Sequence, residues 1–403
     1  MQRVQVDAGV RHAVFALASL HEDFENNAIV GSSENMFALR QYNLAIREHI
    51  RQVAKDKGLG NTEAYLPCLL FVLIEMLRAN YISAVYLARK ATAVLQYSLA
   101  KSKSRGSKDL QGYECFFERL LRRIEMQAIG LIGYDAQSAI CPTQLAVEYA
   151  TVPTAFSSIS EAWDYLEVYG HVYSLSGTGK ADSVVGGPAD SDIRPCSARP
   201  YLDILQQWTT AFNLFLAQQS HWLMPLEKRD ANILRLHQIL NRTSLEVGAL
   251  CLPPEEQTIW DDYHSVFEEA ITLATLILSA HVSETSGSKP SFSLDLGMVG
   301  PLYDIARRCR DPFIRRKAIH MLRICRRREG LWDSSLALLV AERIVAIEED
   351  DVAVQSSADV PRWRRIFNVK PVFSAKESRW YLHYEREASA SRTVTVQIQE
   401  MMT

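Results

Sequence analysis

The chain has 403 residues, of which 48% are hydrophobic and 23% charged, and its formal net charge is −3. This composition is typical of a soluble globular protein with a sizeable core, and the charge excludes a surface coated in basic residues for nucleic acid. No apolar run reaches the roughly 20 residues that span a bilayer, and the first residues lack the apolar core of a signal peptide.

Apolar residues recur at three- and four-residue steps along most of the chain, which predicts helices. The first predicted helix aligns Val10, Val14, Leu17, His21 and Phe24. The second follows a predicted N-cap at Ser33 and is expected to bury Met36, Leu39, Ile46, Ile50 and Val53. Residues 66–96 predict a helical hairpin that turns near Ala79. No copy of it recurs at a fixed period, so a single packed hairpin is favoured over a helical-repeat array.

Later segments continue the helical pattern. Further helices are expected at Leu110–Ile132, Ile159–Tyr173, Tyr201–Leu223, Asp230–Glu246, Glu255–Ala280 and Leu302–Arg308. Loops rich in Ser and Gly interrupt the pattern at 101–108, 174–199 and 283–291. The segment 174–199 is predicted to be mobile. Because helical patterns flank each loop, we interpret them as insertions within one domain.

The stretch RRREGLWDS, Arg326–Ser334, combines three arginines with helix-end residues. Asp311 and Pro312 upstream predict a helix start, and Ile314, Ala318, Met321, Leu322 and Cys325 would share the buried face while Arg316, His320 and Arg323 point away. The three arginines would occupy the last turn of this helix, and Gly330 would be its C′ glycine. Asp333 or Ser334 would cap the next helix, with Trp332 wedged at the corner. We favour this helix corner over a nucleic-acid patch.

The chain ends differently. Trp380, Leu382 and Tyr384 alternate with other residues, as do Val394, Val396 and Ile398, which predicts a β-hairpin. The predicted fold class is therefore all-α: a single large helical domain of packed antiparallel helices at 1–350, and a C-terminal extension with a β-hairpin at 351–403.

Motifs that carry chemistry are missing from the sequence. SGTGKAD fails the phosphate-loop pattern, and neither a G-x-S-x-G nor an H-E-x-x-H motif occurs. Asp261, His264 and Glu268 have helical spacing, as do His21 and Glu25, but solvated helix faces are favoured over metal ligands. RWRR at 362–365 and KSKSR at 101–105 match weak nuclear-import patches, but solvated charge is the favoured interpretation of both. We therefore predict no catalytic, cofactor-binding or metal-ligating residue, and no cofactor.

Seven cysteines are scattered along the chain without C-x-x-C spacing: Cys68, Cys115, Cys141, Cys196, Cys251, Cys309 and Cys325. Free thiols in a reducing compartment are the favoured interpretation. This predicts a nuclear or cytosolic location.

Residues 292–349, FSLDLGMVGPLYDIARRCRDPFIRRKAIHMLRICRRREGLWDSSLALLVAERIVAIEE, resemble the C-terminal part of the fungal-specific transcription factor domain, the regulatory domain of fungal binuclear zinc cluster transcription factors. Segments such as RHAVFALASLHEDFE, FALRQYNLAIREHI, FFERLLRRIEMQA and LQQWTTAFNLFL are similar to the same family in the same order, so that the resemblance covers roughly residues 9–350. Members of this family usually begin with a six-cysteine cluster that reads DNA. Here no cysteine precedes Cys68, and the cluster is predicted to be absent. A stand-alone regulator, a truncated gene model and a domain reused for another purpose are the three alternatives.

The resemblance implies a regulator of transcription in the nucleus, acting in a fungal metabolic or secondary-metabolite gene cluster. It would work through protein partners, such as zinc-cluster transcription factors, and would not bind DNA sequence-specifically by itself. A homodimer and a small-molecule effector stay open as further partners; no membrane partner is expected. The alternatives are a small-molecule-binding protein, expected to contain a pocket of several hundred cubic ångströms with convergent polar groups, and an enzyme of secondary metabolism that reuses the fold.

Overall fold

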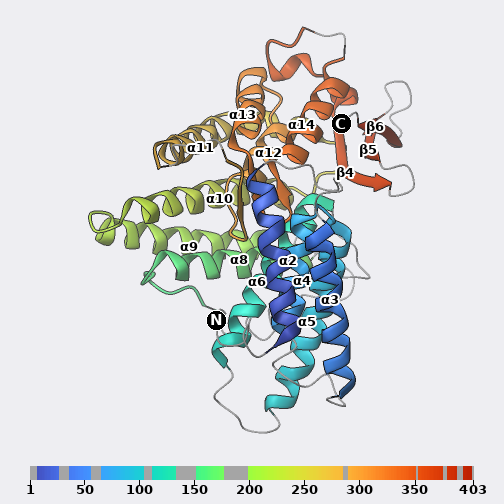
Figure 1. Ribbon diagram of the computed structural model, residues 1–403. Coiled ribbons are helices and arrows are strands. Elements are labelled where there is room, and N and C mark those ends of the chain that lie inside the picture. The colour runs from blue at the N-terminus through green and yellow to red at the C-terminus, as the bar shows by residue number, and fades with distance from the viewer. Residues whose placement is uncertain are drawn as a thin grey trace, which may run out of the picture.

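The computed structural model describes residues 7–26, 36–55, 65–103, 111–132, 151–176, 198–284, 289–350, 353–374, 379–387 and 394–401. Within these ranges the chain is predominantly helical, as the sequence predicts, and carries two small sheets. The N-terminal helices stand side by side, the central helices lie across them, and the last helices and the C-terminal sheet occupy the upper end of the molecule (Figure 1).

The N-terminal helices form the first layer. They are α2 (Ala8–Glu25), α3 (Met36–Lys55), α4 (Tyr65–Leu77), α5 (Tyr81–Lys103) and α6 (Gln111–Ile132). The predicted hairpin is α4 and α5, and it turns at Ala79, whose φ is 56°. Asn80 donates to the buried Glu75 across this turn at 2.7 Å. The hairpin is therefore fixed by a polar contact as well as by its apolar helices.

Helix α3 buries a different face from the one predicted. Its buried residues, Ala38, Tyr42 and Ala45, pack in a small core with α2 and α4. Met36 and Ile50, expected in the core, are 67% and 62% exposed. The reason is packing distance, because small residues on α3 face small residues such as Ala13 and Ala16 on α2 and allow the two helices to approach closely. The predicted N-cap Ser33 lies outside the described residues.

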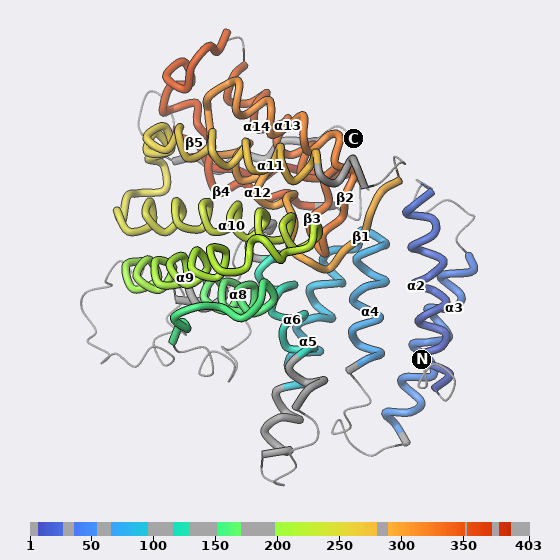
Figure 2. Tube along the Cα trace, turned by 90° about the vertical axis from the view of Figure 1, so that its left-hand side faces the viewer, coloured from blue at the N-terminus to red at the C-terminus, as the bar shows by residue number. Residues whose placement is uncertain are grey.

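The central helices are stacked in layers, and α13 (Pro312–Cys325) lies on the last of them (Figure 2). They are α8 (Ile159–Ser176), α9 (Ala198–Gln219), α10 (Pro225–Ala249) and α11 (His264–Glu284), the last preceded by a 3₁₀ helix at Gln257–Tyr263. Trp208 anchors α9 on α8, since its indole N–H donates to the Ala162 carbonyl at 2.9 Å. Helix α8 extends into the start of the loop predicted at 174–199, and α9 begins just before its end. The rest of that loop, 177–197, lies outside the described residues.

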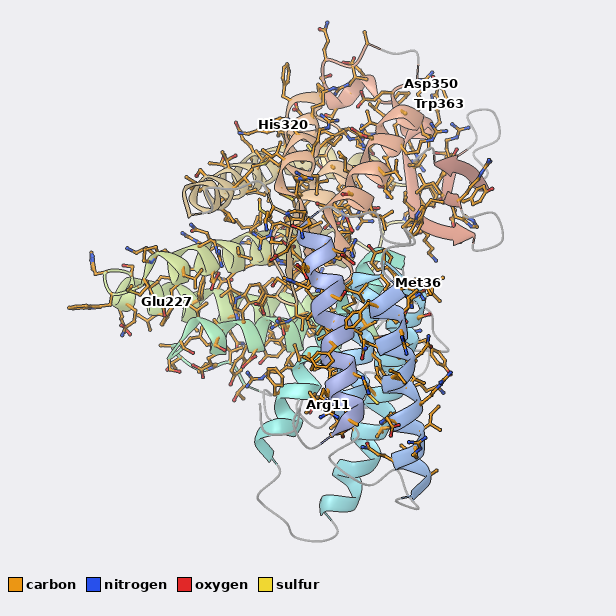
Figure 3. The ribbon with its side chains drawn as sticks, viewed as in Figure 1. Arg11, Met36, Glu227, His320, Asp350 and Trp363 are labelled. Atoms are coloured by element: carbon orange, nitrogen blue, oxygen red, sulfur yellow. The ribbon has the colours of Figure 1, made fainter. Side chains whose placement is uncertain are left out.

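The last helices carry the largest core. They are α12 (Val299–Arg308), α13 (Pro312–Cys325) and α14 (Ser334–Glu348). Asp311 caps α13 by accepting from the Phe313 and Ile314 amides at 3.0 Å each, with Pro312 in the first turn, as predicted. The expected face of α13 is buried, and the labelled His320 points outward from it (Figure 3).

The C-terminal sheet is antiparallel and consists of β4 (Ile366–Ser374), β5 (Arg379–Glu387) and β6 (Val394–Met401). The predicted hairpin is β5 and β6, and it is confirmed. Strand β4 was not predicted, because a bulge between Phe367 and Lys370 and the φ of 50° at Asn368 break its alternation. Leu382 and Tyr384 on β5 are buried in the main core. The sheet is thus packed onto the helices.

Candidate functional site

The stretch RRREGLWDS forms a small β-hairpin. Helix α13 ends at Cys325, and Arg326 follows with a left-handed φ of 39°. Strand β2 (Arg327–Glu329) pairs antiparallel with β3 (Trp332–Asp333) around Gly330, whose φ is 63°. Strand β2 also pairs in parallel with β1 (Ser291–Ser293). The prediction that the arginines complete α13 and that Gly330 is its C′ residue is therefore wrong, since pairing with the distant β1 pulls the chain out of the helix.

Arg328 caps the C-terminus of α4, not that of α13. Its guanidinium donates to the carbonyls of Met76 and Leu77, at 3.1 and 3.0 Å, at the C-terminus of α4. It also pairs with Asp333 at 2.5 Å. Asp333 caps α14 through its other oxygen, which accepts from the Ser335 amide at 2.8 Å. The predicted cap is confirmed, and Arg328 is buried in a structural role.

Glu329 holds the other side of the hairpin. Its side chain is buried and accepts from the amides of Met298 and Val299, at 3.1 and 2.9 Å, where α12 begins. Gly297 makes this approach possible, because a Cβ there would lie 2.1 Å from the carboxylate. Burial raises the pKa of Glu329, against the opposing effect of Arg327. The hairpin therefore ties α4, α12 and α14 together.

A buried ionic cluster lies beside this hairpin. Arg310 and Arg315 have fully buried side chains and both pair with Glu348, at 2.8 and 2.5 Å. Glu348 also accepts from the Ile366 amide at 2.9 Å, which attaches β4 to α14. Burial opposes ionisation of Glu348, but the two arginines outweigh it and lower its pKa to about 2. The cluster joins α12, α13, α14 and the C-terminal sheet.

Charged residues weighed as metal ligands form ion pairs in the structure. Asp261 pairs with Arg365 at 2.6 Å, and His264 pairs with Asp311 at 3.3 Å. Arg365 is buried, so the prediction of solvated charge for RWRR is wrong at this residue, which the carboxylate of Asp261 holds inside the fold. His21 and Glu25 lie 3.7 Å apart on the half-exposed face of α2. Among the described residues no group of three His, Cys, Asp or Glu side chains is placed to hold a metal ion.

The cysteines fit the predicted thiols in part. Cys68, Cys309 and Cys325 are free, and burial raises the pKa of the Cys309 and Cys325 thiols to about 11 and about 12. Cys251 is disulfide-bonded, so the prediction of free thiols is wrong at this position. Over the described part of the chain, no helix combines the length and the apolar character that crossing a membrane requires.

A pocket of about 310 Å³ lies between α6, α8, α9, α10 and α12. This volume is at the lower end of the roughly 300–1,000 Å³ typical of small-molecule sites. Most of its wall is apolar, and it is contributed by Met126, Trp163, Leu166, Leu240, Pro301 and Trp332. Trp332 reaches the pocket from the hairpin and packs on Tyr303, with ring centroids 5.4 Å apart. The hairpin and the pocket therefore share a wall.

His237 is the buried histidine of the pocket. Its Nε2 lies 2.7 Å from the Gly297 carbonyl oxygen, which can only accept, so Nε2 carries the proton. Burial lowers the pKa of His237 to about 4, although Gly297 and Asp304 oppose this effect. The imidazole is therefore neutral at physiological pH and donates to the backbone.

Asp304 brings two arginines to the same wall. It pairs with Arg307 and Arg308, at 2.8 and 2.9 Å. Burial opposes its ionisation, but the two arginines outweigh it and lower the pKa of Asp304. Arg308 also donates to Ser244 at 2.6 Å and lies over the Trp260 ring. One carboxylate is therefore shared by two guanidinium groups, and the other contacts of Arg308 are made within the protein.

Two polar atoms in the pocket lack a partner. Gln127 Nε2 and Glu167 Oε2 are buried and have no hydrogen-bond partner among the residues that the structure describes. Both side chains line the pocket. Buried polar atoms are nearly always paired, so an unpaired donor and an unpaired acceptor in one pocket point to a ligand.

Sequence patterns did not single out any of these residues. Gln127, Glu167 and His237 lie on three predicted helices, α6, α8 and α10, where each reads as an ordinary polar residue. The available signal was a polar residue within an apolar stripe, such as His237 between Leu236 and Leu240. That signal occurs at many structural positions as well.

The fold and the pocket together define an all-α protein with a ligand-sized pocket between its helices. The chain is 21% identical, over 439 residues, to the aspercryptin biosynthesis cluster-specific transcription regulator atnN of Emericella nidulans. The match covers 88% of this chain and 70% of that protein. No family model matches the chain, and no solved structure matches it.

Proposed function

We propose that this protein regulates the transcription of a biosynthetic gene cluster and acts in the nucleus. The observation that carries the proposal is the similarity to a cluster-specific transcription regulator over 88% of the chain. The all-α fold agrees with the regulatory domain that residues 292–349 resemble, and the hairpin at its centre is used for structure. Regulation of transcription accounts for these features without requiring catalysis.

The protein acts on DNA through a protein partner. The inward-facing arginines of RRREGLWDS form ion pairs within the protein. Arg328 pairs with Asp333, and Arg327 pairs with Glu329 at 3.4 Å. A net charge of −3 disfavours a broad phosphate-binding surface. Specific DNA contacts would then come from the partner, and a zinc-cluster transcription factor is the partner that the resemblance favours.

A tethering assay tests the regulatory role. The 403-residue chain is fused to a heterologous DNA-binding domain, and transcription from a reporter that carries the matching sites is measured. We expect a several-fold change in reporter transcription relative to the DNA-binding domain alone. A reporter that stays unchanged in the fungal host, with the fusion expressed in the nucleus, would contradict the proposal.

A salt-dependent titration tests the DNA prediction. The purified chain should bind promoter and scrambled duplexes equally, with a dissociation constant of about 10⁻⁴ M or weaker at physiological salt. Sequence-selective binding near 10⁻⁸ M, lost when Arg326, Arg327 and Arg328 are changed to Ala, would overturn it.

Small-molecule binding is the second candidate function, and the pocket of about 310 Å³ favours it. Its charged groups suit binding better than acid–base chemistry. Asp304 is kept ionised by two arginines, and the proton of His237 is committed to a backbone carbonyl. The two functions are compatible, because a regulator can respond to a bound molecule.

A further inference from the structure

Two of the polar side chains that line the pocket each leave one buried atom unpaired, a donor and an acceptor. Gln127 accepts from the Leu331 amide through Oε1 at 2.8 Å, which leaves Nε2 as the unpaired donor. Glu167 accepts from Arg123 through Oε1 at 2.7 Å, which leaves Oε2 as the unpaired acceptor. Because each side chain is held by its other atom, the unpaired atoms are oriented before a ligand arrives. Such preorganisation favours binding.

The electrostatics of the pocket favour a neutral ligand. Three arginines line it, Arg123, Arg307 and Arg308. Arg307 and Arg308 share Asp304, and Arg123 bonds both Glu167 and Asp295, at 2.7 and 2.6 Å. The third carboxylate, Asp295, is 83% exposed and lies outside the pocket lining, and His237 is neutral. A charged ligand would lose its hydration against the mostly apolar wall, and an anion would also meet the unpaired carboxylate oxygen of Glu167, so the cost of burying it is high.

We propose that this pocket binds a small, neutral, largely apolar molecule that carries an amide group. The amide N–H donates to Glu167 Oε2, and the amide carbonyl accepts from Gln127 Nε2. The apolar part of the molecule packs between Trp163 and Trp332, which line the pocket. A volume of about 310 Å³ fits a compound of one or two rings and excludes a long chain.

The proposed binding site does not depend on the regulatory function, because ligand binding can be measured on the purified protein alone. The site is also connected to the hairpin. Gln127 would contact the ligand through Nε2 while its Oε1 accepts from the Leu331 amide. Failure of the tethering assay would leave the binding result standing, and failure of binding would leave the regulatory role standing. The two proposals are therefore distinguishable.

Indole-3-acetamide, indole-3-acetate and 3-ethylindole are the probes. They share one ring system and differ in carrying an amide, a charged carboxylate or neither. Affinities are measured by ligand-observed NMR titration of the intact chain. We expect the amide to bind at least tenfold more tightly than either of the other probes.

Three variants connect the binding to the pocket. Glu167→Gln replaces the free acceptor with a donor and should weaken amide binding at least tenfold. Gly170→Leu fills the space and should abolish binding; a Cβ at Gly170 meets, among the described atoms, only Met126 Cε at 3.4 Å, so the backbone position has room for a side chain. Glu125→Gln is the matched control. Glu125 is a buried carboxylate on α6 that pairs with Arg89 at 3.3 Å outside the pocket, and its replacement should leave the affinity unchanged.

The probes and variants give different results if the proposed site is right and if it is wrong. Selective binding of the amide that depends on Glu167 and is blocked at Gly170 supports the site. Equal affinities for amide and carboxylate, amide binding that survives both pocket variants, or no binding of the amide at all would each overturn the proposed ligand class.

Discussion

Replacing Glu348 with Gln removes the charge at the centre of the buried cluster while keeping the size of the side chain. Arg310 and Arg315 would then share a neutral partner in a site where the side chains have no exposed area. Breaking a buried ion pair by removing one charge costs about 3–5 kcal/mol. Arg315 would keep the Glu349 carboxylate at 3.2 Å. We therefore expect Glu348→Gln to lower the free energy of unfolding by about 3 kcal/mol.

The pKa of Glu348 gives the same magnitude independently. Its fall from 4.5 to about 2 corresponds to roughly 3 kcal/mol, since one pKa unit is worth about 1.4 kcal/mol. Because the folded-state pKa is the lower one, this stabilisation is fully present above the unfolded pKa of 4.5 and is lost as the pH falls towards about 2. The difference between the wild-type protein and Glu348→Gln should therefore be constant near neutral pH and shrink within this acidic window.

Urea unfolding, followed by circular dichroism from neutral pH down through the window, measures this difference. Glu342→Gln is the control, because Glu342 pairs with Arg323 on the surface, where their side chains are 44% and 56% exposed. A surface pair contributes less than about 1 kcal/mol. A Glu348→Gln variant no less stable than this control, or a difference that does not depend on pH, would refute the reasoning.

Two further substitutions test the hairpin. Trp332→Ala should lower the free energy of unfolding by about 3 kcal/mol, because the indole is 8% exposed and packs on Tyr303; an unchanged urea midpoint would show that the ring contributes no packing. Gly330→Ala should destabilise the fold by at least about 1 kcal/mol, because φ is 63° and the added Cβ would lie 2.2 Å from Gln127 Oε1. Gly170→Ala, at a helical position with room for a Cβ, should be neutral or stabilising in the same urea titration, and equal effects of the two glycine substitutions would contradict the assigned conformation.

Local signals predicted the helices because they act within a few residues. The caps at Asp311 and Asp333, and the hairpin turn near Ala79, follow from side chains that bond nearby amides or from a single left-handed residue. The strands β5 and β6 were found from alternation in the same way. These elements can be predicted from the local sequence, without knowledge of their tertiary contacts.

Distant partners explain what the sequence did not reveal. Strand β2 forms because it pairs with β1, and the two strands are separated along the chain by α12 and α13. Arg310 and Arg365 look like surface charges, yet each is buried against an acid far away in the chain, Glu348 and Asp261. The buried face of α3 was misassigned because small residues on α2 select its alanines. The pocket needs five helices in place, so its residues could not be predicted from any one of them.

Transcript profiling after deletion of the gene tests the central claim most directly. The regulatory account predicts that the transcripts of one contiguous group of biosynthetic genes change together, and that a copy of the gene restores them. A deletion strain that loses a metabolite while the transcripts of its biosynthetic genes stay unchanged would contradict the account and indicate an enzyme instead.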